Sequence, residues 1–151
     1  MVRAIYDAYP MAAKERHVDG NYALSLALDV DTSGETPTDL VIDILRTYPE
    51  AAGVMDHSAN FPLHLALQYE SQWSSELIQS LLDACPLVIN EKDWNGMTPH
   101  QLALKKNASS GMLELLETVT IDKINEWKRF VGHMLIHCFS RSLKYMIFFR
   151  Y

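Results

Sequence analysis

The stretch YPEAAGVMDHSANFPLHLAL, residues 48–67, has a related copy on each side of it. It aligns without a gap to YPMAAKERHVDGNYALSLAL at 9–28 and to CPLVINEKDWNGMTPHQLAL at 85–104. All three copies share a proline at the second position and a closing Leu-Ala-Leu triplet, and the prolines are Pro10, Pro49 and Pro86. Self-similarity at a period of this length is typical of proteins that stack one structural unit repeatedly. The copies therefore predict a repeat architecture.

Each unit is expected to contain two helices. Pro62 suits the first turn of a short apolar helix, where its missing N–H costs nothing. A second helix is predicted over 75–84, because its leucine and isoleucine residues recur at three- and four-residue spacing and bury one face. Cys85-Pro86 ends this helix, since proline cannot continue it. Residues 90–97, which include Asn95-Gly96, indicate a turn.

The turn and short helix of these units match the pattern D-x-x-G-x-T-P-L-H-x-A. The matching positions are Asp93, Gly96, Thr98, Pro99 and Ala103 in the third unit, Asp56, Pro62, Leu63, His64 and Ala66 in the second, and Gly20, Leu24 and Ala27 in the first. On these residues the chain resembles the ankyrin repeat family over roughly residues 2–120. The units are longer than the family's roughly 33 residues, with the excess at 29–38 and 68–74, between the two helices.

The resemblance implies a mainly α fold, an α-solenoid of helix-turn-helix repeats over 1–120. A loose helical stripe in residues 121–151 predicts a C-terminal helical extension. The resemblance also implies structural roles for six residues: His64, Pro62, Pro99, Thr98, Gly96 and Asp93. Four positions depart from the pattern, because Tyr22 and Phe61 replace the capping threonine, Ala59 replaces the turn glycine, and His100 replaces a leucine. We expect those units to be looser than consensus ones.

His64 stands in the apolar run FPLHLAL, where a ligand, a catalyst or a structural group would each explain it. No acid, cysteine or second histidine lies at ligand spacing around it, and a lone histidine rarely carries chemistry without partners. In the ankyrin family the equivalent histidine faces outward from the short helix and hydrogen-bonds nearby backbone. The resemblance therefore implies a neutral, structural imidazole.

Two other stretches raise the question of a metal. Asp29, Asp31, Ser33 and Gly34 fit the first positions of a calcium loop, but the twelfth position is Leu40 instead of a bidentate glutamate. His133 and His137 would share a helical face beside Cys138, yet a zinc site needs three or four ligands and no fourth is evident. No metal or cofactor is expected, and no nucleophile or phosphate-binding signature indicates an enzyme. A small metal protein or enzyme is kept as a distant alternative.

The charge is unevenly distributed. Residues 1–120 carry 7 Lys/Arg against 17 Asp/Glu, and residues 121–151 carry 6 against 2, which together give the net charge of −6. An acidic body repels phosphate backbones, so nucleic acid is not an expected partner. Two cysteines and the lack of a leader-like opening favour an intracellular location, cytoplasmic or nuclear.

The resemblance implies a non-catalytic scaffold that binds another protein through its turn tips and concave helix face. The alignment places eight candidate contact residues there: Trp94, Met97, Asn95, His57, Ser58, Asn60, Tyr69 and Lys105. Trp94 is the main candidate, because an indole at a turn tip has little core to fill and tryptophan dominates binding hot spots. The alternative is that Trp94 folds back onto its neighbouring turn.

The two ends differ from the repeats. Residues 1–8 match the end of a second helix, which indicates a truncated first unit, as in a fragment of a longer protein. Residues 121–151 are basic and aromatic with a loose helical stripe. They suit a cap on the last repeat, an oligomer contact or a membrane surface, and a mistranslated end is the remaining explanation. A membrane-peripheral adaptor is therefore the alternative function.

Overall fold

The computed structural model describes residues 9–29, 36–69, 73–119 and 124–130. The chain divides into two compact units, Met1–Val119 and Thr120–Tyr151. The chain is mainly α-helical, and within the described ranges the extended pairing is limited to one isolated bridge between Arg16 and Tyr22. The expectations for residues 1–8, for the loop at 30–35 and for 131–151 lie outside these ranges.

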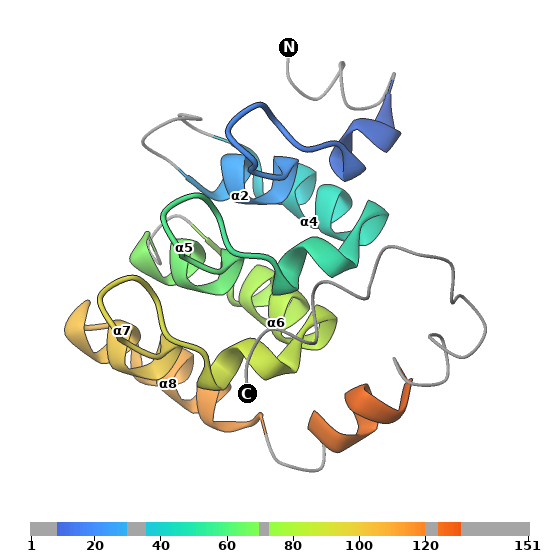
Figure 1. The fold of residues 1–151 in the computed structure, drawn as a ribbon. Helices are drawn as coiled ribbons and strands as arrows, with labels where there is room; N and C mark the ends of the chain where they lie inside the picture. The colour runs from blue at the N-terminus through green and yellow to red at the C-terminus, as the bar shows by residue number, and fades with distance from the viewer. Residues whose placement is uncertain (1–8, 30–35, 70–72, 120–123, 131–151) are drawn as a thin grey trace, which may run out of the picture. The chain divides into compact units, whose positions relative to one another are not determined.

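Each repeat, formed by one sequence copy and the helix that follows it, has the same order of elements: a 3-10 helix, a turn, a short α-helix and a longer α-helix (Figure 1). The first repeat contains η1 (Pro10–Lys14), α2 (Ala23–Leu28) and α4 (Thr38–Thr47), the second η2 (Pro49–Gly53), α5 (Pro62–Gln68) and α6 (Ser75–Ala84), and the third η4 (Pro86–Asn90), α7 (Pro99–Lys105) and α8 (Ser110–Glu117). The helix predicted over 75–84 is confirmed with those bounds. The 3-10 helices were not predicted; a proline begins each of them, where its missing N–H is harmless.

Helices of successive copies pack against one another. The short helix α5 contacts α2 on one side and α7 on the other, and the longer helices α4 and α6 contact each other (Figure 1). The contact surfaces are leucine-rich, with Ala66 and Ala103 fully buried where small side chains allow helices to approach closely. The fully buried large aliphatic side chains are Leu24, Leu28, Leu40, Val41, Leu63, Leu67, Leu77, Ile78, Leu81, Leu82 and Val88. This core fixes the three turns relative to one another.

The N-caps of the short helices differ where the sequence departs from the repeat pattern. Thr98 caps α7 in a complete capping box with Gln101, whereas Tyr22 and Phe61 give α2 and α5 no side-chain cap. A missing N-cap hydrogen bond typically lowers stability by about 1 kcal/mol. The first two short helices therefore depend more on packing than the third does.

The three turns share one backbone conformation. A left-handed residue occupies the same alignment position in each, with φ of 83° at Gly20, 60° at Ala59 and 75° at Gly96. In each turn a backbone N–H also bonds the carbonyl four residues on, at 2.8 Å (His17 to Asn21), 2.8 Å (Asp56 to Asn60) and 2.9 Å (Asp93 to Met97). The second unit holds this conformation with an alanine, which is strained at positive φ.

Replacing Ala59 with glycine is expected to raise the free energy of unfolding by about 0.5–1 kcal/mol, because glycine relieves the left-handed strain but gains freedom in the unfolded chain. Gly96→Ala is the matched reverse change, since a Cβ there meets no atom within 4 Å and only conformational strain is added. Urea denaturation followed by circular dichroism measures both. Destabilisation by Ala59→Gly would show that the second turn needs its methyl group more than a relaxed backbone.

In the C-terminal compact unit, Thr120–Tyr151, the described part is one helical segment, residues 124–130. Its Phe130 side chain is 65% exposed, and the adjacent Lys128 and Arg129 are also exposed. In the portion of the chain that the structure describes, no helix has the length and apolarity needed to cross a membrane.

Candidate functional site: a groove beside the turn tips

Aspartate side chains hold the second and third turns rigid. Asp56 Oδ1 accepts the backbone N–H groups of Ser58 and Asn60, both at 2.8 Å. Asp93 Oδ1 accepts those of Asn95 at 2.9 Å and Met97 at 2.8 Å, in the same register. Hydrogen bonds from backbone N–H groups to a carboxylate are among the stronger ones in proteins. These two carboxylates therefore fix the tips that carry most of the predicted contact residues.

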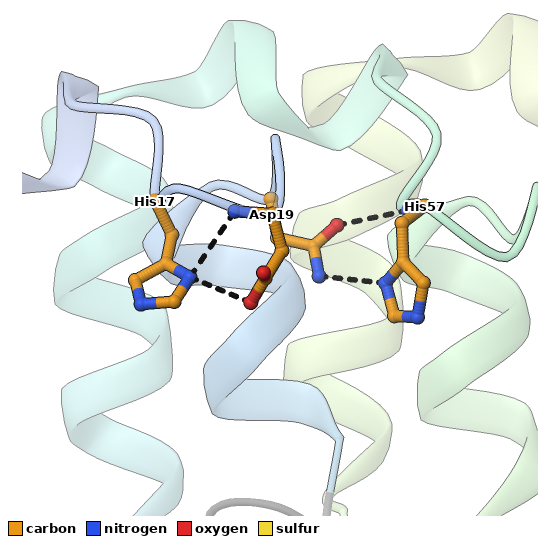
Figure 2. Close-up of polar contacts among 4 residues, drawn as sticks. His17, Asp19 and His57 are labelled. Atoms are coloured by element: carbon orange, nitrogen blue, oxygen red, sulfur yellow. Dashed lines mark hydrogen bonds and ion pairs between the residues drawn. The ribbon is translucent and has the colours of Figure 1, made fainter.

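The first turn has a histidine where the other two have aspartate. His17 Nδ1 lies 2.8 Å from Asp19 Oδ2, and the Asp19 backbone N–H reaches the same nitrogen at 3.5 Å (Figure 2). Both side chains are at least half exposed, so this pair contributes little to stability. The first tip is consequently held less firmly by its own side chains than the other two.

A side-chain clamp joins the first turn to the second. The His57 backbone N–H donates to Asn21 Oδ1 at 2.9 Å, which fixes the orientation of the amide and directs Nδ2 toward the His57 ring (Figure 2). Asn21 Nδ2 then donates to His57 Nδ1, also at 2.9 Å. In this arrangement Nδ1 is the acceptor, which leaves Nε2 as the ring nitrogen that carries a proton. The clamp sets the position of His57 at the tip.

Asn21→Ala is expected to lower the free energy of unfolding by about 1–3 kcal/mol, because it removes both bonds of a buried amide. The exposed Asn90 provides the control. The free energy of unfolding of Asn90→Ala should stay within about 0.5 kcal/mol of the wild-type value. Urea denaturation of the two variants at neutral pH measures the difference. Equal effects would mean that the clamp adds no net stability.

His64 joins α5 to the third turn. Its side chain is 1% exposed, and Nε2 donates to the Met97 carbonyl at 3.2 Å. Burial lowers the pKa of His64, against the smaller opposing effects of Asp93 and of its backbone hydrogen bonds. The ring is thus neutral and bonded to backbone, but it is enclosed by the protein instead of facing outward. The enclosure follows from the third turn, whose Met97 carbonyl bonds the ring.

Five of the eight predicted contact residues line one cavity of about 480 Å³: His57, Ser58, Asn60, Tyr69 and Trp94. Asp29, Asp56, Leu65 and Gln68 complete its lining. We call this cavity the tip groove. Its residues come from the end of α2, the second turn, α5 and the third turn, so it exists only when successive units pack in this register.

The other predicted contact residues lie differently. Asn95 and Lys105 are exposed but are not part of the groove lining, and Met97 is half-buried. Asn60 lines the groove but is only 7% exposed, and its Nδ2 donates to Asp56 Oδ2 at 3.3 Å. Its side chain serves the turn, so we correct the expectation that Asn60 offers an exposed contact. Trp94, in contrast, is 67% exposed and does not fold back into the protein.

The lining outside the eight predicted contacts includes Asp56 and Leu65. Asp56 had been aligned only with the turn motif, and Leu65 belongs to the apolar Leu-Ala-Leu triplet. Together with Asp29, Asp56 gives the groove two carboxylates, and no lysine or arginine contributes to its lining among the residues that the structure places. The tip groove therefore has an acidic and aromatic character.

Two other groups are shifted toward their neutral forms. Burial raises the pKa of the Cys85 thiol, and burial together with a hydrogen bond to Tyr22 raises the pKa of Tyr48 to about 12. A nucleophile requires the opposite shift. Among the described positions, no three His, Cys, Asp or Glu residues are grouped to hold a metal ion. His133, His137, Cys138 and most of the calcium-like loop lie outside those positions.

Neither a protein-family model nor a curated protein matches this chain.

Proposed function

We propose that this protein is a non-catalytic scaffold that binds another protein through the tip groove, and that its units form an ankyrin-like solenoid. The observation that carries the proposal is that four of the predicted contact residues line one cavity: His57, Ser58, Tyr69 and the exposed Trp94. Binding energy at interfaces is concentrated in a few residues of this kind, with tryptophan and tyrosine enriched.

The repeated turn supports the solenoid. Three turns with a left-handed residue in register, and a central short helix in contact with both neighbouring short helices, are what a stack of equivalent units requires. Such a stack buries a core between units and leaves the tips in a row. The tips are then free to vary in sequence without loss of the fold, which suits a binding surface.

The protonation states support binding over catalysis. His64 is buried in its neutral form and Cys85 is held as a thiol, so neither has the environment of a general base or a nucleophile. One of the two acidic groove residues also serves a turn, because Asp56 accepts three hydrogen bonds within its own turn. The site is built to be rigid.

Affinity capture from a source lysate tests the proposal, with full-length wild type, Trp94→Ala and Phe130→Ala compared by quantitative mass spectrometry. The exposed side chains of Trp94 and Phe130 are matched at 67% and 65%, and only Trp94 lines the groove. We expect a protein whose recovery falls at least about tenfold with Trp94→Ala, the loss typical of a hot-spot residue, and is unchanged with Phe130→Ala. If recovery of a protein fell with Phe130→Ala and not with Trp94→Ala, the binding would be assigned to residues 120–151 instead of the tip groove.

The membrane-peripheral alternative is favoured by one observation, the exposed Phe130 next to the exposed Lys128 and Arg129 in the helix at 124–130. An aromatic side chain beside cations suits the interface of an anionic bilayer. Sedimentation of the full chain with vesicles of phosphatidylserine and phosphatidylcholine, compared with a Lys128→Glu/Arg129→Glu double variant, tests it. Equal sedimentation of the two proteins would remove this alternative.

A further inference from the structure

We infer that the tip groove takes the side chain of an arginine from a peptide segment of the partner protein. This inference rests on the proposed function and specifies the partner's chemistry. It follows from three properties of the groove. The aromatic walls and the negative charge favour a planar cation, and the volume suits one long side chain.

The aromatic walls come from two different units. Trp94 projects from the third turn with two thirds of its side chain exposed, and Tyr69 follows α5 in the second unit. A cation over the face of an aromatic ring is attracted by the ring quadrupole, most strongly over tryptophan, and arginine makes such contacts more often than lysine does. The guanidinium plane also stacks on aromatic faces, which a compact ammonium cannot do.

The charge of the groove selects the same ligand. Asp29 and Asp56 are both in the lining, and His57 Nδ1 is occupied by its bond with Asn21 Nδ2. A carboxylate offers about four acceptor positions. Among the residues that the structure describes, the turn fills three of those on Asp56, and Oδ2 accepts from Asn60 Nδ2 alone. One acceptor position on a rigidly held, partly exposed carboxylate therefore remains for an incoming donor.

The size of the groove favours a side chain carried on a peptide. Its volume of about 480 Å³ is in the lower part of the range for small-ligand pockets, roughly 300–1,000 Å³, and suits one long side chain with part of its backbone. The first 120 residues carry 7 cationic against 17 anionic side chains, so a cationic segment is also attracted at longer range. A nucleic acid or an acidic peptide would be repelled.

The test uses full-length protein and three acetylated, amidated glycine–serine peptides with one central residue: arginine, lysine or citrulline. Citrulline keeps the shape of arginine without its charge. The Trp94 indole N–H is observed in ¹H–¹⁵N NMR spectra and assigned by its loss in Trp94→Ala. We expect the arginine peptide to shift this signal with a dissociation constant on the order of 1 mM, and the citrulline peptide to bind about tenfold more weakly.

Asp29→Asn and Glu76→Gln form the matched pair of charge variants. Both remove one negative charge, but Glu76 lies in the first turn of α6 and does not line the groove. Asp29→Asn should weaken arginine-peptide binding several-fold, and Glu76→Gln should leave it unchanged. Equal weakening would mean that only the overall charge attracts the peptide, which overturns a specific site.

Three further results overturn the inference. The first is no shift of the Trp94 signal at about 10 mM arginine peptide. The second is equal binding of the arginine and citrulline peptides, and the third is a Trp94 shift that depends on protein concentration alone, which would make a second copy the occupant. A lysate protein lost with Trp94→Ala while the arginine peptide fails to bind would leave the scaffold function standing. It would refute only the arginine assignment.

Discussion

Leu67→Ala is expected to lower the free energy of unfolding by about 2–5 kcal/mol, the range for a buried leucine whose removal leaves a cavity. The same change at Leu104 should cost less than about 1 kcal/mol, because little apolar surface is removed from water there in the folded state. The two residues close the same Leu-Ala-Leu triplet in the second and third units. Leu67 is 0% exposed and Leu104 is 51% exposed.

Comparing Leu67→Ala with Leu104→Ala separates the effect of burial between helices from the effect of the local sequence. The residue type, the helix position and the neighbouring alanine are the same in both units, so a difference in cost reflects what covers the side chain. Urea denaturation of both variants, followed by far-ultraviolet circular dichroism, gives the two free energies with a common slope. Equal costs would mean that the Leu104 side chain is covered as fully as that of Leu67, contrary to its exposed fraction in the structure.

The same triplets show why the helices could be predicted from the sequence. The three- and four-residue spacing of apolar positions in 75–84 and the proline at 62 are local signals, so the places of α5 and α6 can be predicted from the sequence, although helices this short are stabilised mainly by packing. Because the same pattern recurs in the other two repeats, the same helices can be predicted there. The exposure of Leu104 is not visible in this pattern, because it depends on what lies next to α7.

The candidate site was predictable only in part, for a related reason. The turn tips could be located from aligned residues such as Trp94 and His57, and the register of the stack brings them to one groove. The Asn21–His57 clamp joins residues 36 positions apart, and nothing local to either residue indicates it. The burial of His64 likewise depends on the third turn, since its bond to the Met97 carbonyl spans 33 positions.

His64→Ala is expected to lower the free energy of unfolding by about 2–4 kcal/mol at pH 8, because it leaves a cavity and removes the bond to Met97. His64→Gln should cost less, since an amide N–H₂ can replace Nε2 as the donor. A comparable loss at the exposed His17 in His17→Gln would contradict this, because the His17 side chain is half exposed and its polar contacts are with Asp19 in the same turn.

The cost of His64→Ala should shrink as the solution is acidified. The folded protein holds the pKa of His64 below its ordinary value of 6.5, so in acid the unfolded chain binds a proton that the folded chain resists. The wild type therefore has its full stability above about pH 6.5 and loses it as pH falls toward the lowered pKa, with a slope from this one group of at most about 1.4 kcal/mol per pH unit. His64→Ala lacks that slope. Parallel pH profiles of the wild type and the variant between pH 8 and 5 would show that His64 is protonated in the fold, and would remove the neutral imidazole from the account of how α5 holds the third turn.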